Sequence, residues 1–308
     1  MPAPAAPPLR HGRQNLAILL AQTAACLGLI QALHLPMAWP WKALVLMVFC
    51  IVMQGTFSMM HEACHGNGHP HRRLNALVGV WAATLFGSAY TLIRVNHEGH
   101  HVRNRTPAEL AEYILPGESR LTKTALYYFA VLGGIWLGSF AATLLLPFVP
   151  FRFAKALAVR WQSMDGYNRS FAEFSARDWW ALRLESILFV AFWIGVVWLF
   201  DWRWPVLALA YAAFAFSYSS LQWIYHLRTP LDRVEGAYDL RAPWFIRWPF
   251  LNFNYNLSHH RYPRAPWQEL HARAIAHETQ PLWRRWIGVL RPPEPFPARP
   301  DLLTKVYF

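Results

Sequence analysis

The chain has 308 residues, of which 55% are hydrophobic, 16% aromatic and only 15% charged. Soluble domains carry about 25% charged residues, so this composition excludes an ordinary water-soluble fold. The formal net charge is +12, but the Lys and Arg residues flank apolar stretches and form no separate basic domain. That placement is typical of cytoplasmic loops beside anionic lipid, and we expect no nucleic-acid partner.

Five apolar stretches are long enough to cross a hydrocarbon core of about 30 Å, which takes about 20 helical residues. In chain order they are Leu16–Leu35, Trp41–Met60, Ala125–Val149, Leu184–Phe200 and Val206–Tyr225. A weaker stretch, Leu74–Ile93, is predicted to be buried or interfacial. No cleavable signal is evident before the first span, which is expected to act as its own insertion signal.

The distribution of charge predicts the orientation of these spans. The two short turns, residues 36–40 and 201–205, carry only Asp201 and Arg203 as charged residues. Nearly all Lys and Arg residues lie in the N-terminus, in residues 94–123 and 152–183, and in the long C-terminal part. The positive-inside rule therefore predicts that both termini and these basic segments are cytoplasmic.

A parity argument limits the number of crossings. Histidine-rich segments follow the second span and the last span, and five crossings would leave them on opposite sides of the membrane. The third stretch, Ala125–Val149, is interrupted by three glycines and a proline, so we predict that it is re-entrant or interfacial. The predicted fold is an all-α integral membrane protein with four transmembrane helices as two hairpins, interfacial helices and a cytoplasmic histidine-rich cap. It forms one domain over 1–308, with a flexible N-terminus over 1–14 and a C-terminal tail over 290–308.

The histidines are the strongest functional signal in the sequence. They form three clusters and one single position: His61 and His65; His97, His100 and His101; His259 and His260; and His226. Separations of three or four residues place imidazoles on one helix face, close enough to share a metal. Eight imidazoles at one membrane boundary suit two first-row metals with about four nitrogens each. Imidazole ligation alone fits Fe, Zn, Cu or Ni.

These residues resemble the histidine boxes of the membrane fatty acid desaturase and hydroxylase superfamily. The matching elements are His61-Glu-Ala-Cys-His65, His97-Glu-Gly-His100-His101, Asn256-Leu-Ser-His259-His260 and Gln222-Trp-Ile-Tyr-His226. The resemblance implies two iron ions held by the eight histidines, O2 as co-substrate, cytoplasmic ligands and an external electron donor of the ferredoxin, rubredoxin or cytochrome b5 type.

Two positions depart from the pattern of that family. Asn256 stands where the family often has His or Gln, and its amide oxygen is expected to bind a metal weakly or to hold a metal-bound water. Gln222 stands in place of an Asn. Both replacements predict a more open coordination sphere at one metal.

Carboxylates near the clusters are candidates to orient imidazoles through their second ring nitrogen. By position alone they are Glu62, Glu98, Glu109, Asp232, Glu235 and Asp239. Glu62 and Glu98 point about 100° away from the ligand face of a helix, so pairing with nearby arginines is equally expected. Five arginines lie close to the proposed ligands: Arg103, Arg105, Arg228, Arg261 and Arg264. They are candidates to bind a substrate head group or an acidic redox partner, and the alternative is plain positive charge beside lipid headgroups.

The predicted reaction is O2-dependent desaturation of an acyl chain or similar lipid. Hydroxylation, carotenoid ketolation and oxidative decarboxylation of a fatty acid to a terminal alkene remain alternatives within the same superfamily. The sequence has no Rossmann motif, haem motif or ferredoxin cysteine set, so electrons are expected from another protein. Two other classes stay open: a metal transport or storage protein, whose ligands are expected deep in the bilayer, and a membrane zinc hydrolase.

Overall fold

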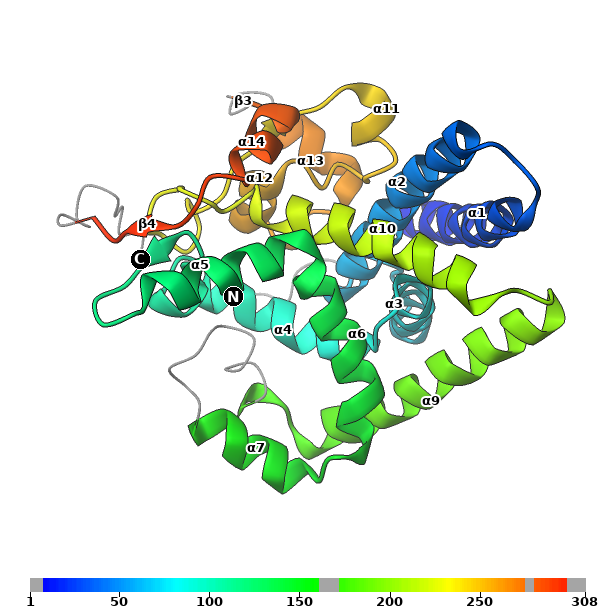
Figure 1. The fold of residues 1–308 in the computed structure, drawn as a ribbon, viewed down its shortest axis with the longest axis horizontal. Coiled ribbons are helices and arrows are strands. Elements are labelled where there is room, and N and C mark those ends of the chain that lie inside the picture. The colour runs from blue at the N-terminus through cyan, green and yellow to red at the C-terminus, as the bar shows by residue number, and fades with distance from the viewer. Residues whose placement is uncertain (1–7, 161–171, 275–279, 298–308) are drawn as a thin grey trace.

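Two long antiparallel hairpins form the frame of the protein. In the computed structural model, which describes residues 8–160, 172–274 and 280–297, the first hairpin is α1 (Leu9–His34) with α2 (Trp39–Cys64). The second is α9 (Ala176–Leu199) with α10 (Trp204–Trp223), and Figure 1 shows both. Apolar composition around nearly the whole circumference of these helices is what a lipid environment requires.

The turns of the two hairpins lie together at one end of the molecule. The indole Nε1 of Trp202 donates to Gln31 Oε1 at 2.6 Å, and the Arg203 amide donates to His34 Nε2 at 2.9 Å. The His34 and Trp202 rings also stack, with centroids 5.7 Å apart. Because the turns share one end, the C-terminal ends of α2 and α10 share the other, which is where the histidines follow.

The stretch Leu74–Ile93, predicted to be buried or interfacial, is divided between two helices. α3 (Arg72–Phe86) ends at Gly87, whose φ of 97° favours glycine, and α4 (Tyr90–Arg103) leaves at a bend of 102°. The Phe86 carbonyl at the end of α3 accepts a hydrogen bond from a side chain of another helix, Trp136 Nε1, at 2.8 Å. The bend places the second histidine cluster on a helix of its own, α4.

The third apolar stretch is broken at the glycines that led us to predict a re-entrant segment. α5 (Arg120–Phe129) continues through the π-helical turn η2 (Ala130–Gly134) into α6 (Ile135–Leu145). Gly133 has a φ of 139°, outside the helical region, and α5 and α6 run in different directions in Figure 1. The Trp136 amide freed at this kink donates to Ser219 Oγ at 3.1 Å.

By length and composition, five helices of the described chain are suited to cross a membrane. They are Leu9–His34, Trp39–Cys64, Arg120–Phe148, Ala176–Leu199 and Trp204–Trp223, and the bent α3–α4 pair would be a sixth. Arg120–Phe148 includes the short turn η3 (Leu146–Phe148). The protein is thus an α-helical chain with several membrane-compatible helices, and four crossings remain a prediction.

Short elements form a cap at the histidine end. They are η1 (Pro107–Glu109), β1 (Tyr113–Ile114), β2 (Leu240–Arg241), α11 (Trp244–Arg247), α12 (Asn256–Arg261), α13 (Trp267–Ala274), β3 (Gln280–Pro281), α14 (Leu282–Gly288) and β4 (Glu294–Pro295). β1 pairs with β4 and β2 pairs with β3, both parallel. α7 (Phe151–Arg160) lies before α9 in the chain.

The described parts of the two termini are ordered next to the rest of the chain, and residues 1–7 and 298–308 lie outside the described residues. The N-terminus, expected to be flexible over 1–14, is helical from Leu9, because α1 extends two turns beyond its apolar span and packs its Gly12 against His69. The tail expected from 290 is packed through Pro295, since β4 pairs with β1 and Glu294 forms an ion pair with Arg228 at 3.3 Å.

Candidate metal centre

All eight predicted histidines meet at the end of the hairpins opposite the turns. Two groups have ligand nitrogens within 4.8 Å of one another. The five-histidine group is His61, His65, His97, His101 and His259, and the three-histidine group is His100, His226 and His260. They come from α2 and its C-cap residue His65, from α4 and α12, and from the segment after α10. The convergence is as expected, but the split is five and three rather than four and four.

The rings of the five-histidine group approach one another through their Nε2 atoms. His97 Nε2 lies 2.7 Å from His65 Nε2 and 3.0 Å from His101 Nε2. His259 Nε2 lies 3.0 Å from His101 Nε2. The His61 ring lies 4.3 Å from the His97 ring between centroids. These rings therefore surround one small volume with their nitrogens.

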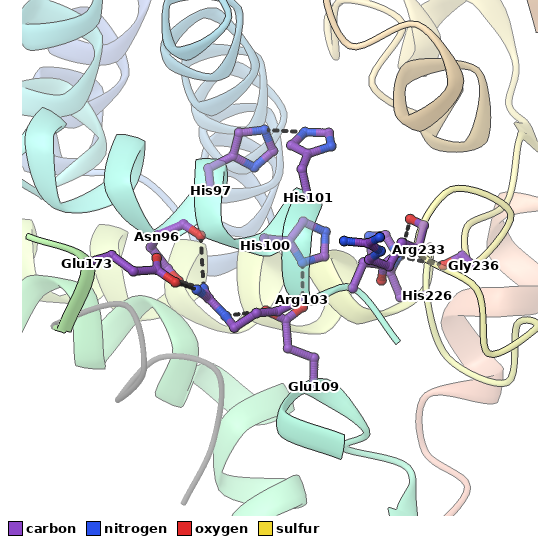
Figure 2. A network of polar contacts seen from close by, with 11 residues as sticks. Asn96, His97, His100, His101, Arg103, Glu109, Glu173, His226, Arg233 and Gly236 are labelled. Atoms are coloured by element: carbon purple, nitrogen blue, oxygen red, sulfur yellow. Dashed lines mark hydrogen bonds and ion pairs between the residues drawn. The ribbon is translucent and has the colours of Figure 1, made fainter. Parts of the chain in front are cut away.

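The rings of the three-histidine group are oriented by oxygen atoms on their outer side. His100 Nδ1 lies 2.6 Å from Glu109 Oε2, and His226 Nδ1 lies 2.9 Å from Gly236 O; Figure 2 shows both contacts. The His260 ring lies 5.0 Å from His226 and 5.3 Å from His100 between centroids. When Nδ1 donates to these oxygens, the Nε2 atoms of His100 and His226 keep lone pairs free for a metal.

The two groups are immediate neighbours. The His101 ring of the first lies 4.6 Å from the His260 ring of the second, and His259 and His260 are consecutive residues of α12. Consecutive residues of a helix point about 100° apart, so one short helix supplies a ring to each group. The arrangement suits two metal ions side by side.

The donor set fits metal ions better than it fits hydrogen bonds alone. A neutral imidazole has one N–H and one lone pair. Where four rings face each other through their Nε2 atoms, some of these nitrogens therefore point lone pair against lone pair. Two nitrogens bound at about 2.1 Å to one first-row metal lie about 3 Å apart when the N–metal–N angle is about 90°. The Nε2–Nε2 distances of 2.7 to 3.0 Å in this group are of that size. Several buried atoms here also lack a hydrogen-bond partner among the described residues: His61 Nε2, His259 Nδ1, His260 Nε2 and Asn256 Oδ1.

The protonation states of the rings also favour metal binding. Burial, with a smaller contribution from the charge of Arg264, lowers the pKa of His65 to about 4. Burial and the neighbouring imidazoles hold the pKa values of His259 and His260 well below the usual range. Burial does the same to the pKa of His226. Imidazoles bind metals in the neutral form, so these rings are ready to do so at neutral pH.

The two amides that depart from the family pattern both carry a side-chain atom without a hydrogen-bond partner among the described residues. Asn256 is buried, starts α12, and lies four residues before His260, on the same helix face. Its Oδ1 has no partner among the described residues, and neither has Nε2 of Gln222. An unpaired buried oxygen beside the three-histidine group suits the proposed weak ligand or water-holding role of Asn256.

Three of the six candidate carboxylates, Glu62, Glu98 and Asp232, have other partners in the described structure. Glu62 accepts from the Trp267 amide at 3.0 Å. Glu98 is paired with Arg94 at 3.0 Å. Asp232 accepts from two amides of its own loop. For Glu98 the pairing with an arginine, weighed as the alternative, is the one found.

Two other candidate carboxylates contact the histidines or the helix that carries them. Glu109 contacts His100 directly, and its second oxygen lies 3.3 Å from Nε of Arg103. Asp239 accepts from the Ser258 amide at 2.9 Å and from its hydroxyl at 2.7 Å, which fixes the start of α12. The contact of His226 with the Gly236 carbonyl could not be predicted from the sequence, because every residue type has the same backbone oxygen.

Two of the five candidate arginines are buried in ion pairs, where they are not accessible to a substrate head group. Arg103 contacts Glu109 and Glu173, as Figure 2 shows. Arg105 is paired with Glu112 at 2.7 Å, and both side chains are almost fully buried. These two arginines brace the loop that carries Glu109, which is a structural role.

The remaining three arginines lie nearer to the surface. Arg228 is paired with Glu294 at 3.3 Å, and Arg261 with Glu235 at 2.6 Å. Arg264 is exposed and has no ion-pair partner among the described residues. Of the original five, Arg264 is therefore the one still suited to meet an external partner.

A family model described as fatty acid desaturase matches residues 34–286, which is more than half of the chain and includes all eight histidines. No curated protein matches the chain.

Proposed function

We propose, from the premise that this chain belongs to the fatty acid desaturase family, that it is a membrane oxidoreductase that desaturates an acyl chain or a similar lipid. The reaction uses O2 and electrons from an external donor. The observation that carries the proposal is the meeting of eight histidines, in groups of five and three, at one end of membrane-compatible helices.

In this proposal two iron ions are held by the five-histidine and three-histidine groups, with Asn256 near the second. When bound, the irons supply the power to activate O2 and to withdraw hydrogen from an unactivated C–H bond. Glu109 and the Gly236 carbonyl orient His100 and His226 through Nδ1. Second contacts of this kind fix the tautomer of a ligand and raise its basicity.

Aromatic side chains close the membrane side of the five-histidine group. The rings of Phe57 and Phe253 lie 6.2 Å and 5.0 Å from the His61 ring between centroids. Tyr218 packs against Phe57 at 4.9 Å. These residues exclude water from that side and offer an apolar wall, against which we expect the alkyl chain to lie.

We place the histidine groups and both termini on the cytoplasmic side of a multi-pass membrane protein. The two hairpin turns share one end and are poor in Lys and Arg, and the basic segments follow the other ends of the helices. This distribution agrees with the positive-inside rule. A cytoplasmic site also gives a soluble electron donor access to the metals.

The proposed function is tested by expressing the full chain with a ferredoxin and its reductase, followed by mass spectrometry of the cellular lipids. Loss of two hydrogens from an acyl chain supports desaturation. Gain of one oxygen supports hydroxylation or ketolation, and a terminal alkene shortened by one carbon supports decarboxylation. A lipid profile identical to that of a His101→Ala control would contradict an oxidative role.

A further inference from the structure

Three segments that are distant in the sequence are tied together beside the five-histidine group. Asn15 Nδ2 of α1 donates to Asn67 O at 3.0 Å, and Asn67 Nδ2 donates to Ala265 O at 3.3 Å. Trp267 Nε1 donates to Asn15 Oδ1 at 2.9 Å. Asn15 is fully buried. We call the surface formed by residues 10–15, 66–73 and 264–268 the Asn15 face.

The Asn15 face adjoins the metal centre directly. Its second segment follows His65 in the chain, and its third begins four residues after His260. The Trp267 amide donates to Glu62, which is the next residue after His61. A partner seated on this face would be close to the five-histidine group.

The Asn15 face is strongly basic. Its exposed arginines are Arg10, Arg13, Arg72, Arg73 and Arg264. None of them has an ion-pair partner in the described parts of the chain, whereas Arg103, Arg105, Arg228 and Arg261 all do. The neighbouring acid Glu269 is paired with Arg273 at 2.8 Å. Five uncompensated guanidinium groups therefore define a surface complementary to an acidic partner.

The same surface lacks the side chains of a bilayer contact. Within residues 10–15, 66–73 and 264–268 no large hydrophobic side chain is exposed, whereas Leu9, Leu77 and Tyr262 at the borders of the face are each more than half exposed. On α9, by contrast, Ile187 is 63% exposed and Trp198 is 82% exposed. The Asn15 face itself carries no such apolar pattern, so its chemistry suits a polar, acidic partner better than lipid chains.

We propose that the Asn15 face is the docking surface for an acidic, water-soluble protein that carries one electron at a time. This inference rests on the proposed function, in which each turnover needs two external electrons. The acyl chain gives up two hydrogen atoms as its double bond forms, the carrier gives two electrons in two docking events, and two protons come from solvent. Together these reduce one O2 to two waters.

Binding to the metal-free protein tests the docking without requiring turnover. The probe is an acidic [2Fe–2S] ferredoxin, titrated against the full chain in neutral detergent at low salt. The test variant is Arg13→Glu/Arg73→Glu/Arg264→Glu, and the control is Arg120→Glu/Arg152→Glu/Arg177→Glu, which reverses three exposed arginines outside this face. We expect the Kd to rise by at least about tenfold in the test variant, since complementary charges steer such complexes, and to change less than about threefold in the control.

Electron transfer provides a second measurement. Reduced ferredoxin is mixed anaerobically with the iron-loaded protein, and its oxidation is followed by stopped flow. The second-order rate constant should fall in the test variant in proportion to binding, and it should fall with rising salt in the wild type. Reduction by dithionite, iron content and Tm should match the wild type, which shows that the variant is folded.

Three outcomes would overturn the docking proposal. The first is a test variant that binds and accepts electrons as the wild type does. The second is an equal loss in the control variant. The third is a defect that appears only with vesicles containing anionic lipid, which would make the face a lipid contact. If the wild type accepts electrons but no lipid is oxidised, the docking stands and the proposed function fails.

Discussion

The five-histidine and three-histidine groups differ in what positions their rings. In the first, rings from α2, α4 and α12 contact one another, and no carboxylate of the described chain contacts them. In the second, Glu109 and the Gly236 carbonyl hold His100 and His226 from outside. The difference teaches that helix packing builds one half of the centre, while short segments that follow His100 and His226 in the chain complete the other.

The largest expected effect comes from the ring that joins the two groups. His101 contacts His97 and His259 in its own group and lies 4.6 Å from His260 in the other. In His101→Ala we expect loss of iron from both groups and a fall in turnover of about a thousandfold, because metal-ion catalysis contributes several kcal/mol. Metal analysis and lipid mass spectrometry measure both, with the exposed His71→Ala as control.

An intermediate effect is expected to separate the two groups. Glu109→Gln weakens the contact that orients His100, so the three-histidine group should lose metal affinity by about 10- to 100-fold. Metal content at limiting iron should then fall from two ions per chain toward one. Glu98→Gln is the matched control, because Glu98 is exposed and paired with Arg94. Equal loss of both ions in Glu109→Gln would contradict the separate support of the two groups.

Acid should destabilise the metal-free protein through the five-histidine group. The pKa of His65 is about 4 in the folded chain and about 6.5 in the unfolded chain. Between these values the unfolded state binds the proton and the folded state does not, so stability falls as the pH falls. We expect a loss of about 2 kcal/mol from this group, seen as a lower Tm at pH 4.5 than at pH 7.5. His65→Ala should reduce that pH dependence, and His71→Ala should leave it unchanged.

The smallest effect is expected at the amide of the three-histidine group. If Asn256 Oδ1 holds a metal or its water, Asn256→Ala should weaken iron binding there by a few fold, about 1 kcal/mol. Asn256→Asp should bind as tightly as the wild type or more tightly, because a carboxylate is the stronger oxygen ligand. Iron titration of the two variants compares them. A tighter site in Asn256→Ala would mean that the buried amide oxygen has no ligand role.

The sequence was sufficient to predict the hairpins and the meeting of the eight histidines. Apolar length gave α1, α2, α9 and α10, because one helix of about 20 residues is a local property of the chain. The spacings in residues 61–65 and 97–101 gave rings on one helix face for the same local reason. The resemblance to the desaturase superfamily, stated from those motifs, is confirmed by the family match over residues 34–286.

The tertiary structure alone decided how these parts meet. The bend at Gly87 was not predicted, although a glycine in that stretch was an available signal for a helix end. The division of the histidines into five and three, the contact of Glu109 with His100, and the ion pairs that occupy Arg103 and Arg105 all join residues that are far apart or on separate elements. Local periodicity fixes which side of a helix a residue takes, whereas the partner on the facing element depends on packing and on chain connections that no single segment encodes.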